Sequence, residues 1–453
     1  MKKDNKKALK ITIKKMVPTV LIAMIATALG LLSLYRSKVP MINDFGTMLT
    51  IGIVAAFIIA VLLFLPFLFI RDTNFPKEEK KKENNKVSNK IIHKMVGFIV
   101  KFKYVILSIA ILLAVIGIVV DLDAPAETNL ENFMPQDSEA LKDIRELRDL
   151  IGSTEQIAIV FESENILMTN NLDSIILIEQ ALNSAFDDEI IEMTSLIKLF
   201  NQMGLNDTST MTEASLKNIP LDQRKLFIND TSTKTVINVS IGEMSDEEFT
   251  SFIAEIDSIL LEHGSGMKIA VTGQSIIDSE MMFALTNGRY EITIIGLLLI
   301  FFTLLIIYRS FYRALLPIIP ILLIVGWSGG MMAIFGMSYT PLTATLGALI
   351  MGIGTEFTIL ITERFEEEKL KTEDRKLAIQ NTLSSMSKPI IVSALTTMGG
   401  FSALIFSDFL ILSNFGIMTV VNLSLALLST IFVLPALLAV TFKGNKNYVD
   451  LTV

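Results

Sequence analysis

The sequence contains no cysteine and only two histidines, His93 and His263, which are far apart. The missing thiols exclude disulfides, thiolate metal sites, iron–sulfur ligands and a cysteine nucleophile. Two distant histidines leave neither a zinc-hydrolase pattern nor a Ser–His–Asp triad. The phosphate-binding pattern GxxxxGK[ST] is absent, so this polypeptide is not itself an ATP-driven pump subunit. We therefore expect no enzymatic activity, no metal and no organic cofactor.

Charged residues are also scarce: they make up 19% of the 453 residues, whereas 51% are apolar and the mean hydropathy is +0.56. Soluble domains do not average so far to the apolar side. Eight stretches are long enough to cross a hydrocarbon core of ~30 Å, which takes about 17–25 residues. The stretches are Val17–Tyr35, Gly46–Ile70, Tyr104–Val120, Ile292–Tyr308, Ala314–Met337, Leu342–Thr362, Pro389–Phe406 and Ile417–Val440. We predict an α-helical integral membrane protein with eight transmembrane helices.

Lysine and arginine gather in particular connecting segments. The N-terminus, the linker 71–103, the turn 309–313 and the loop 363–388 are rich in them, and an eight-span path places all four on one side. Segments rich in these residues stay in the cytoplasm. We expect a multi-pass protein of the cell membrane with both termini in the cytoplasm. We expect the first stretch to be a membrane span and not a cleaved signal peptide, because a second span follows it closely and no A-x-A site lies behind it.

This path divides the chain into six segments. They are an amphipathic stretch with two transmembrane helices (1–70), a basic cytoplasmic linker (71–103), a transmembrane helix (104–120), an extracytoplasmic α+β domain (121–290), five transmembrane helices (291–442) and a cytoplasmic tail (443–453). Residues 121–290 include 31 acidic and 10 basic residues. This acidity serves solubility on the outer side, and we expect no nucleic acid as a partner.

The segment 121–290 alternates between strand and helix patterns. Strands are predicted at 156–161, 190–195, 235–241 and 268–272, and helices at 137–151, 171–185 and 245–262. Ser245 and the acids that follow it predict a cap for the last of these helices. Two βαβ units within about 120 residues favour a ferredoxin-like, split βαβ domain.

The two ends of the chain resemble each other. At an offset of 370 residues, Thr27, Gly30 and Leu34 match Thr397, Gly400 and Leu404, and Phe45-Gly46 matches Phe415-Gly416. Pro18 matches Pro389, and Leu65-Pro66 matches Leu434-Pro435, each with a one-residue slip. Each copy consists of two spans after an amphipathic stretch. Repeated halves are a common feature of transporters.

This organisation resembles the resistance–nodulation–division superfamily, in particular exporters related to mycobacterial large membrane proteins (MMPL) and hopanoid transporters. The resemblance is carried by NLENFMPQD at 129–137, LGALIMGIGTEFTILITERFEEE at 346–368, and residues 392–415. It implies a porter-like domain at 121–290 and an MMPL or sterol-sensing-like block at 291–442. A complete family member has twelve spans and two outside domains, whereas this chain resembles the last two spans of a first half and a whole second half. The sequence is then a truncated or split gene product, or a partner chain or second copy supplies the remainder.

The resemblance implies secondary active transport: export of hydrophobic or amphipathic molecules, such as lipids or drugs, driven by the proton-motive force. The implied partners are membrane lipid, the substrate, protons, and either a homo-oligomer or a partner chain. Two alternatives stay open. One is assistance to protein translocation, as in the SecD and SecF branch, and the other is a non-transporting lipid sensor or scaffold, because sterol-sensing domains resemble the five-span block.

Glu356 is the only charged residue inside a predicted span, about two-thirds of the way towards the cytoplasm. A carboxylate at such a depth is costly, and is usually retained for function. No span contains a lysine or arginine to pair with it, and burial without a partner favours the protonated form. In the family that this chain resembles, an acid in the corresponding span carries proton coupling. Many relatives have Asp-Tyr where this sequence has Glu356-Phe357. The alternative is a glutamate that only hydrogen-bonds a neighbouring helix.

Ser393, Thr396, Thr397 and Gly400 follow i, i+3, i+4 and i+7 spacing and share one helix face. We expect this stripe to admit a neighbouring helix and to offer hydroxyls to Glu356, as a relay or helix contact. The alternative is that the hydroxyls bond only their own backbone. Thr355 is a weaker candidate for the same role.

Two glycines and two prolines are predicted to act through the shape of the backbone. Gly352 and Gly354 precede the acid, and we expect them to allow close helix packing. Pro317 and Pro320 interrupt the fifth span and are hinge candidates.

Overall fold

The computed structural model describes residues 2–74, 86–127, 133–151, 156–242, 244, 246–264, 266–286 and 288–441. The chain forms two compact units. The membrane unit contains Met1–Glu127 and Phe283–Val453, and the α+β domain contains Thr128–Met282. The predicted tail 443–453, part of the linker 71–103, part of the 129–137 motif and the predicted cap residue Ser245 lie outside the described residues.

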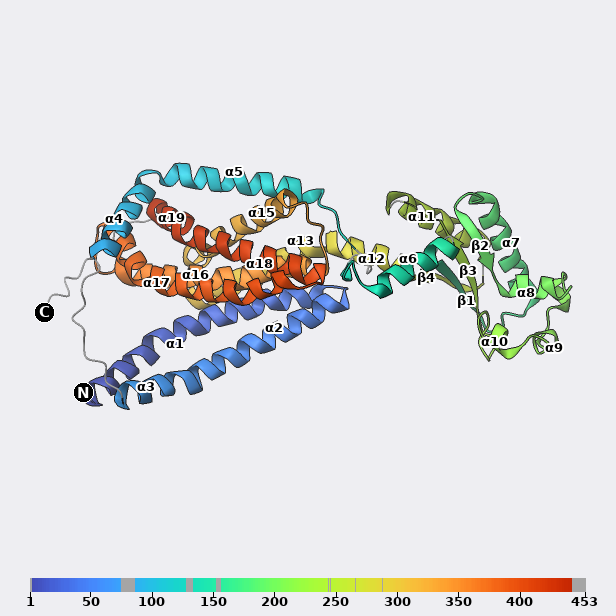
Figure 1. Cartoon of the computed structure of the whole chain (residues 1–453), viewed down its shortest axis with the longest axis horizontal. Helices are drawn as coiled ribbons and strands as arrows, with labels where there is room; N and C mark the ends of the chain where they lie inside the picture. Colours follow the sequence, from blue (N-terminus) through green and yellow to red (C-terminus); the bar gives the residue numbers. More distant parts are fainter. Residues whose placement is uncertain are drawn as a thin grey trace. The chain divides into compact units, whose positions relative to one another are not determined.

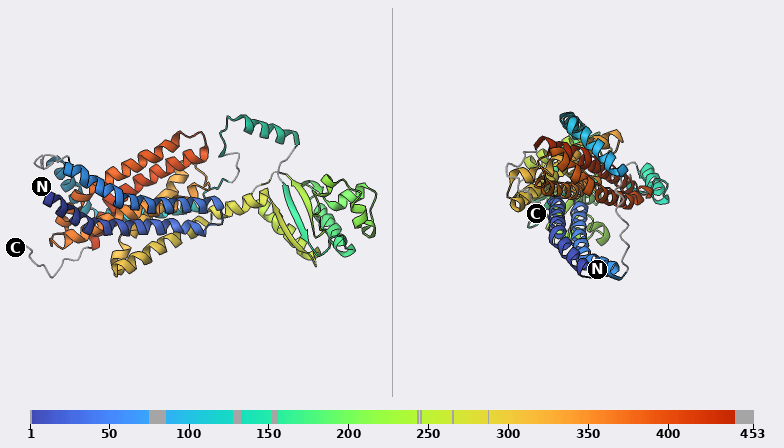
Figure 2. Two further views of the ribbon diagram at one scale, coloured as in Figure 1. Left: turned by 90° about the horizontal axis from the view of Figure 1, so that it is seen from below. Right: turned by 90° about the vertical axis from the view of Figure 1, so that its left-hand side faces the viewer.

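The membrane unit consists of α-helices joined by short 3₁₀ and π-helical turns. The α-helices are α1 (Lys2–Leu32), α2 (Pro40–Ile59), α3 (Leu65–Asn74), α4 (Lys86–Lys101), α5 (Lys103–Leu122), α13 (Gly288–Tyr308), α14 (Phe311–Leu315), α15 (Ile318–Ile334), α16 (Leu346–Lys369), α17 (Arg375–Ser402), α18 (Leu410–Leu428) and α19 (Leu434–Thr441). The 3₁₀ turns are η1 (Ser33–Arg36), η5 (Thr343–Thr345) and η6 (Ala403–Phe406), and the π-helical turns are η2 (Ala60–Phe64) and η7 (Ser429–Val433). The long helices of this unit run lengthwise beside one another (Figure 1, Figure 2).

Eight helical segments within the described residues are long and apolar enough to cross a membrane. They match the eight predicted spans, so this prediction is confirmed. Large apolar side chains cover the outside of the unit: Leu62 is 65% exposed and Leu112 is 59% exposed. Lipid tails, rather than water, suit such a surface.

The repeated ends of the chain fold alike. α1 ends at Leu32 and α17 at Ser402, and α2 begins at Pro40 and α18 at Leu410, so both boundaries keep the offset of 370. The turns between them close with equivalent backbone hydrogen bonds of 3.0 Å, from Ser37 to Leu34 and from Ser407 to Leu404. Each second helix contains a π-helical turn just before its proline. Proline lacks the N–H that a regular helix needs there, so the wider turn occurs in both copies.

The α+β domain contains one four-stranded sheet. Its strands are β1 (Gln156–Glu162), β2 (Ile190–Thr194), β3 (Lys234–Ile241) and β4 (Lys268–Gly273). Its helices are α6 (Glu139–Ile151), α7 (Thr169–Ala185), α8 (Leu196–Gln202), α9 (Glu213–Leu216), α10 (Leu221–Arg224), α11 (Asp246–His263) and the first part of α12 (Gln274–Thr286), with the 3₁₀ turn η4 (Thr208–Thr210). The strand order is β2-β3-β1-β4, and every neighbouring pair is antiparallel. This is the order of a split βαβ sandwich, which confirms the predicted ferredoxin-like fold.

Alternation along the strands builds the core of this domain. Ile157, Ile159 and Phe161 of β1 are each 0% exposed, and residues between them are less buried. Ile159 pairs with Ile237 on β3 and Val271 on β4. One face of the sheet therefore joins the apolar faces of α7 and α11 in a single core.

Candidate functional site

Glu356 lies in α16, the most buried of the candidate spans. Its neighbours Thr355 and Phe357 are buried, whereas Glu356 is partly exposed. Among the described residues, no hydrogen bond or ion pair reaches the Glu356 carboxylate. Thr355 donates its hydroxyl hydrogen bond to the carbonyl of Met351 in its own helix. Thr355 and Glu356 are therefore adjacent in sequence but not hydrogen-bonded.

Helix α1 packs closely against α16 just before the acid. The Thr27 hydroxyl is 2.9 Å from the carbonyl oxygen of Gly352 on α16 and 3.0 Å from that of Ala23 on its own helix. A Cβ atom on Gly352 would lie 2.9 Å from the Thr27 methyl group, so the contact requires glycine. A Cβ on Gly354 would meet Ile321 at 3.6 Å, an ordinary contact.

The predicted stripe on α17 does not bond to Glu356. Thr396 and Thr397 donate to the carbonyls of Val392 and Ser393 in their own helix, at 2.8 and 3.0 Å. Ser393, Thr396 and Gly400 are exposed, and no atom lies within 4 Å of a Cβ built on Gly400. The role of the stripe stays a prediction.

The repeat gives this stripe a counterpart. At the offset of 370, Ser393, Thr396, Thr397 and Gly400 correspond to Ala23, Ala26, Thr27 and Gly30 of α1. The α1 residues face α16 and α13: Ala23 and Ala26 are buried, and Gly30 lies beside Ile300 and Gly352. The same helix face is covered in one copy and exposed in the other.

The two prolines lie at the start of α15. Pro317 immediately precedes this helix, and Pro320 lies in its first turn, where a backbone N–H has no partner within the helix. The span breaks between α14 and α15 at this point. A hinge role for the prolines stays a prediction.

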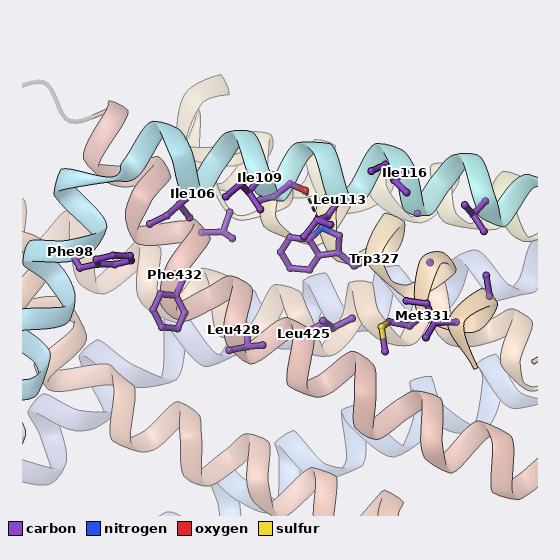
Figure 3. A pocket seen from close by; sticks show the side chains of 17 residues that line it. Phe98, Ile106, Ile109, Leu113, Ile116, Trp327, Met331, Leu425, Leu428 and Phe432 are labelled. Carbon is purple, nitrogen blue, oxygen red and sulfur yellow. Dashed lines mark hydrogen bonds between the residues drawn. The ribbon is translucent and has the colours of Figure 1, made fainter. Parts of the chain in front are cut away.

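A large apolar cavity lies between α4, α5, α15 and the α18–η7 segment (Figure 3). Its volume is about 790 Å³. The residues that line it are Phe98, Ile106, Ile109, Ala110, Leu113, Ile116, Gly117, Val120, Trp327, Gly330, Met331, Ala333, Ile334, Leu425, Leu428, Phe432 and Val433. The only polar side-chain atom among them, the Trp327 indole N–H, donates to the carbonyl of Ala110 at 3.0 Å. The cavity can therefore hold an apolar group of ligand size, and it offers no charged anchor.

Small residues bring the walls of this cavity together. A Cβ atom on Gly117 of α5 would overlap the carbonyl oxygen of Gly326 on α15, and one on Gly326 would lie 2.6 Å from the Ala114 carbonyl. Such close crossings are typical of small-xxx-small patterns in membranes. The sequence carries this signal on both spans, but it does not indicate that these two spans meet.

Comparison with known proteins agrees with this architecture. The family model described as "MMPL family" matches residues 1–101 and 132–447. The chain belongs to the MMPL family. The predicted membership, and the likeness to the resistance–nodulation–division superfamily, are thereby confirmed.

Relatives of this MMPL protein include a membrane protein of Methanocaldococcus jannaschii, which is 24% identical over 354 residues, covering 74% of this chain and 90% of that protein. The sulfolipid-1 exporter MmpL8 of Mycobacterium tuberculosis is 24% identical over 236 residues, covering 50% of this chain and 21% of the exporter. The chain thus spans nearly the whole of one relative and a small part of the other.

Two solved structures share the fold. The hedgehog release protein Disp from the water bear Hypsibius dujardini has a TM-score of 0.72 and 15% identity, with 96% of this chain and 59% of that chain covered. SecDF of Thermus thermophilus, a translocon-associated membrane protein, has a TM-score of 0.52 and 16% identity, with 95% and 49% covered. At these identities the likeness concerns the fold alone.

Proposed function

We propose that this MMPL protein exports hydrophobic or amphipathic molecules, of the lipid class, and that a proton gradient drives the export. The observation that carries the proposal is Glu356: a carboxylate inside a span, without a hydrogen bond or ion pair to any described residue. The apolar cavity supports the substrate class, and so does the relative whose name is sulfolipid-1 exporter.

Proton binding at Glu356 changes how α16 packs. A neutral carboxylic acid is tolerated beside apolar helices, whereas a carboxylate favours water or a cation. Just before Glu356, Thr27 and Gly352 hold α1 against α16. A change of charge at Glu356 therefore acts on a tight contact between two helices, which is a suitable element for switching between two packings.

We also propose that both termini face the cytoplasm and that residues 121–290 are extracytoplasmic. The support is the placement of lysine and arginine in the N-terminus and in the segments 71–103, 309–313 and 363–388.

The stripe on α17 supports a partner helix. Its counterpart on α1 covers a glycine of α16, so the exposed stripe suits a helix with the features of α16. A second copy of this chain is a poor occupant, because its own α1 already lies against that surface of α16. We therefore propose that a helix from a partner chain, rather than a homo-oligomer, covers Thr397 and Gly400.

The proposal can be tested with the full chain in vesicles of phosphatidylethanolamine and phosphatidylglycerol, with a fluorescent phospholipid as the probe. Glu356→Gln should abolish probe movement that depends on an imposed pH gradient, and Glu356→Asp should retain part of it. Glu373→Gln, an exposed acid in the loop after α16, is the matched control and should behave as the wild type.

Gradient-dependent movement in Glu356→Gln at the wild-type rate would exclude this role of the residue. A wild-type protein that binds the probe without moving it would favour the sensor alternative.

A further inference from the structure

A buried polar cluster joins the points where the chain leaves and re-enters the membrane unit. Asp121 near the end of α5 and Arg289 near the start of α13 are 7% and 5% exposed. Arg289 Nη2 is 3.2 Å from Asp121 Oδ2 and donates to the Asp121 carbonyl at 2.6 Å. Tyr290 and Tyr339 each donate a hydrogen bond of 2.7 Å to the Asp121 carboxylate. The two charges therefore neutralise each other inside the unit.

The other edge of the Arg289 guanidinium has no acceptor among the described residues. Its Nε and Nη1 atoms are buried and have no hydrogen-bond partner in the described part of the chain. Arg289 lines a cavity of about 40 Å³ together with the hydroxyl-bearing residues Thr293, Ser328 and Thr343. A buried N–H without an acceptor is costly, and a polar cavity needs only about 10–15 Å³ per water molecule. This first cavity suits a small cluster of waters.

A second cavity, with two polar side chains in a mostly apolar wall, lies further along α16. Asn422 of α18 is 3% exposed, and neither its amide oxygen nor its amide nitrogen has a partner among the described residues. The hydroxyl of Thr419, one turn earlier, also has no hydrogen-bond partner among the described residues. Both residues line a cavity of about 10 Å³ together with Gly354 of α16. That volume suits one water, which would satisfy groups that otherwise remain unbonded.

The two cavities share wall residues on α16, and the second lies beside the helix face that carries Glu356. Leu346 and Ile350 of α16 form part of the wall of both. Ile353, also in the wall of the second cavity, precedes Glu356 by three residues, about one helical turn, and so shares its face of α16. Buried polar groups without a partner in the described part of the chain therefore occur along α16, from the Asp121–Arg289 cluster to the turn before the acid.

We propose that these two cavities are water sites and that they form the route by which protons reach Glu356 from the end of the membrane unit at Asp121 and Arg289. The inference rests on the proposed proton coupling and names residues for it. Each water on the route accepts one proton on its oxygen and releases another. The net change is one proton taken from bulk water and one O–H bond formed on the Glu356 carboxylate. Asp121 is essential to this route, because an unpaired Arg289 would repel a proton.

The first test is X-ray hydroxyl-radical footprinting of the full chain in lipid nanodiscs, since radicals formed from bound water label adjacent side chains. Leu423 lines only the second cavity and Tyr339 only the first, and both are buried. Both should be labelled in the wild type. Asn422→Leu should reduce labelling at Leu423 about tenfold, as expected when a water loses one or two hydrogen bonds, and should leave Tyr339 unchanged.

Ser424→Ala is the matched control, because Ser424 lies on α18 but lines neither cavity and bonds Val420. It should leave both labels unchanged. Absent labelling in the wild type, or labelling of Leu423 that Asn422→Leu does not alter, would overturn the proposal.

The second test follows hydrogen–deuterium exchange of the Glu356 carboxyl group by infrared spectroscopy, with its band identified by loss in Glu356→Gln. Asn422→Leu should slow this exchange about tenfold if it removes a relay water. Unchanged exchange would overturn the route while leaving proton coupling intact. Absence of any exchanging Glu356 band in the wild type would instead contradict the proposed coupling itself.

Discussion

Thr27 and Thr397 occupy equivalent positions in two copies of one helical repeat, yet only Thr27 reaches another helix. Its hydroxyl is 2.9 Å from the Gly352 carbonyl on α16, whereas the Thr397 hydroxyl bonds Ser393 in its own helix at 3.0 Å. The sequence preserves a contact face that the described chain uses once. The proposed second use is contact with a helix that has the features of α16.

This asymmetry predicts opposite effects of a glycine-to-alanine substitution on α16, where the first copy makes its contact, and on the exposed face of the second copy. Gly352→Ala places a Cβ atom 2.9 Å from the Thr27 methyl group, and such overpacking costs about 1–3 kcal/mol. Gly400→Ala meets no atom within 4 Å and should be neutral or stabilising by up to about 1 kcal/mol, because alanine favours a helix more than glycine does. Reversible unfolding of the purified chain in detergent measures both. Equal destabilisation would show that Gly400 already has a covered face in the purified protein.

The partner helix can be sought directly, because the chain contains no cysteine. In Thr397→Cys, a benzophenone maleimide attached to the single thiol should cross-link to a transmembrane peptide in membranes of the source cells. Mass spectrometry should identify a peptide with a small-residue and acid pattern like that of 352–356. Leu112→Cys, on the exposed face of α5, is the control and should yield lipid adducts. A cross-link to a second copy of this chain would favour a homo-oligomer, and lipid adducts alone at position 397 would exclude the partner helix.

The spans and the sheet could be predicted from sequence because their signals are local. Length and lack of charge indicate the spans, and alternation along Ile157, Ile159 and Phe161 indicates a strand. Glu356 could be found because it is the only charge inside a predicted span.

The polar cavities and the apolar cavity depend on contacts between distant segments. Asp121 and Arg289 bond across 168 residues. In the sequence, Asp121 follows one apolar stretch and Arg289 precedes another, as ordinary interfacial charges do. Asn422 is one uncharged polar residue in an apolar helix. Nothing in its sequence context indicates that both its amide atoms lack a partner among the described residues, because that depends on which α16 side chains lie opposite.

Glu179 on α7 predicts the pH dependence of the α+β domain. Burial raises the pKa of this carboxyl above its usual value of 4.5, although Ser195 and Lys198 act in the opposite direction. The folded domain therefore holds this proton more tightly than the unfolded chain. The contribution to stability is full below the unfolded pKa and is lost as pH rises through the folded pKa. Glu179→Gln should remove this pH dependence and protect the domain in alkaline buffer.

Amide hydrogen exchange of β1 and β3 in the full chain, corrected for the intrinsic effect of pH, measures this stability. Glu255→Gln is the control, because Glu255 is exposed on α11 and is not among the groups that shift the pKa of Glu179. Glu179 does not cause the pH dependence if protection of β1 and β3 rises as pH passes from the unfolded to the folded pKa of this carboxyl. The same conclusion follows if both variants behave alike.

The only tryptophan of the chain, Trp327, lines the apolar cavity and can report its occupancy. Phospholipid with brominated acyl chains quenches indole fluorescence on contact, so titration should quench Trp327 in a saturable manner. Leu428→Phe fills part of the cavity without adding a second fluorophore, as Leu428→Trp would. It should weaken saturable quenching severalfold, because the added ring competes with the acyl chain for apolar volume. Ile51→Phe, on the exposed face of α2, should leave the titration unchanged. Quenching that rises linearly with bromolipid and is equal in both variants would mean that Trp327 senses bulk lipid and that no acyl chain is held in the cavity.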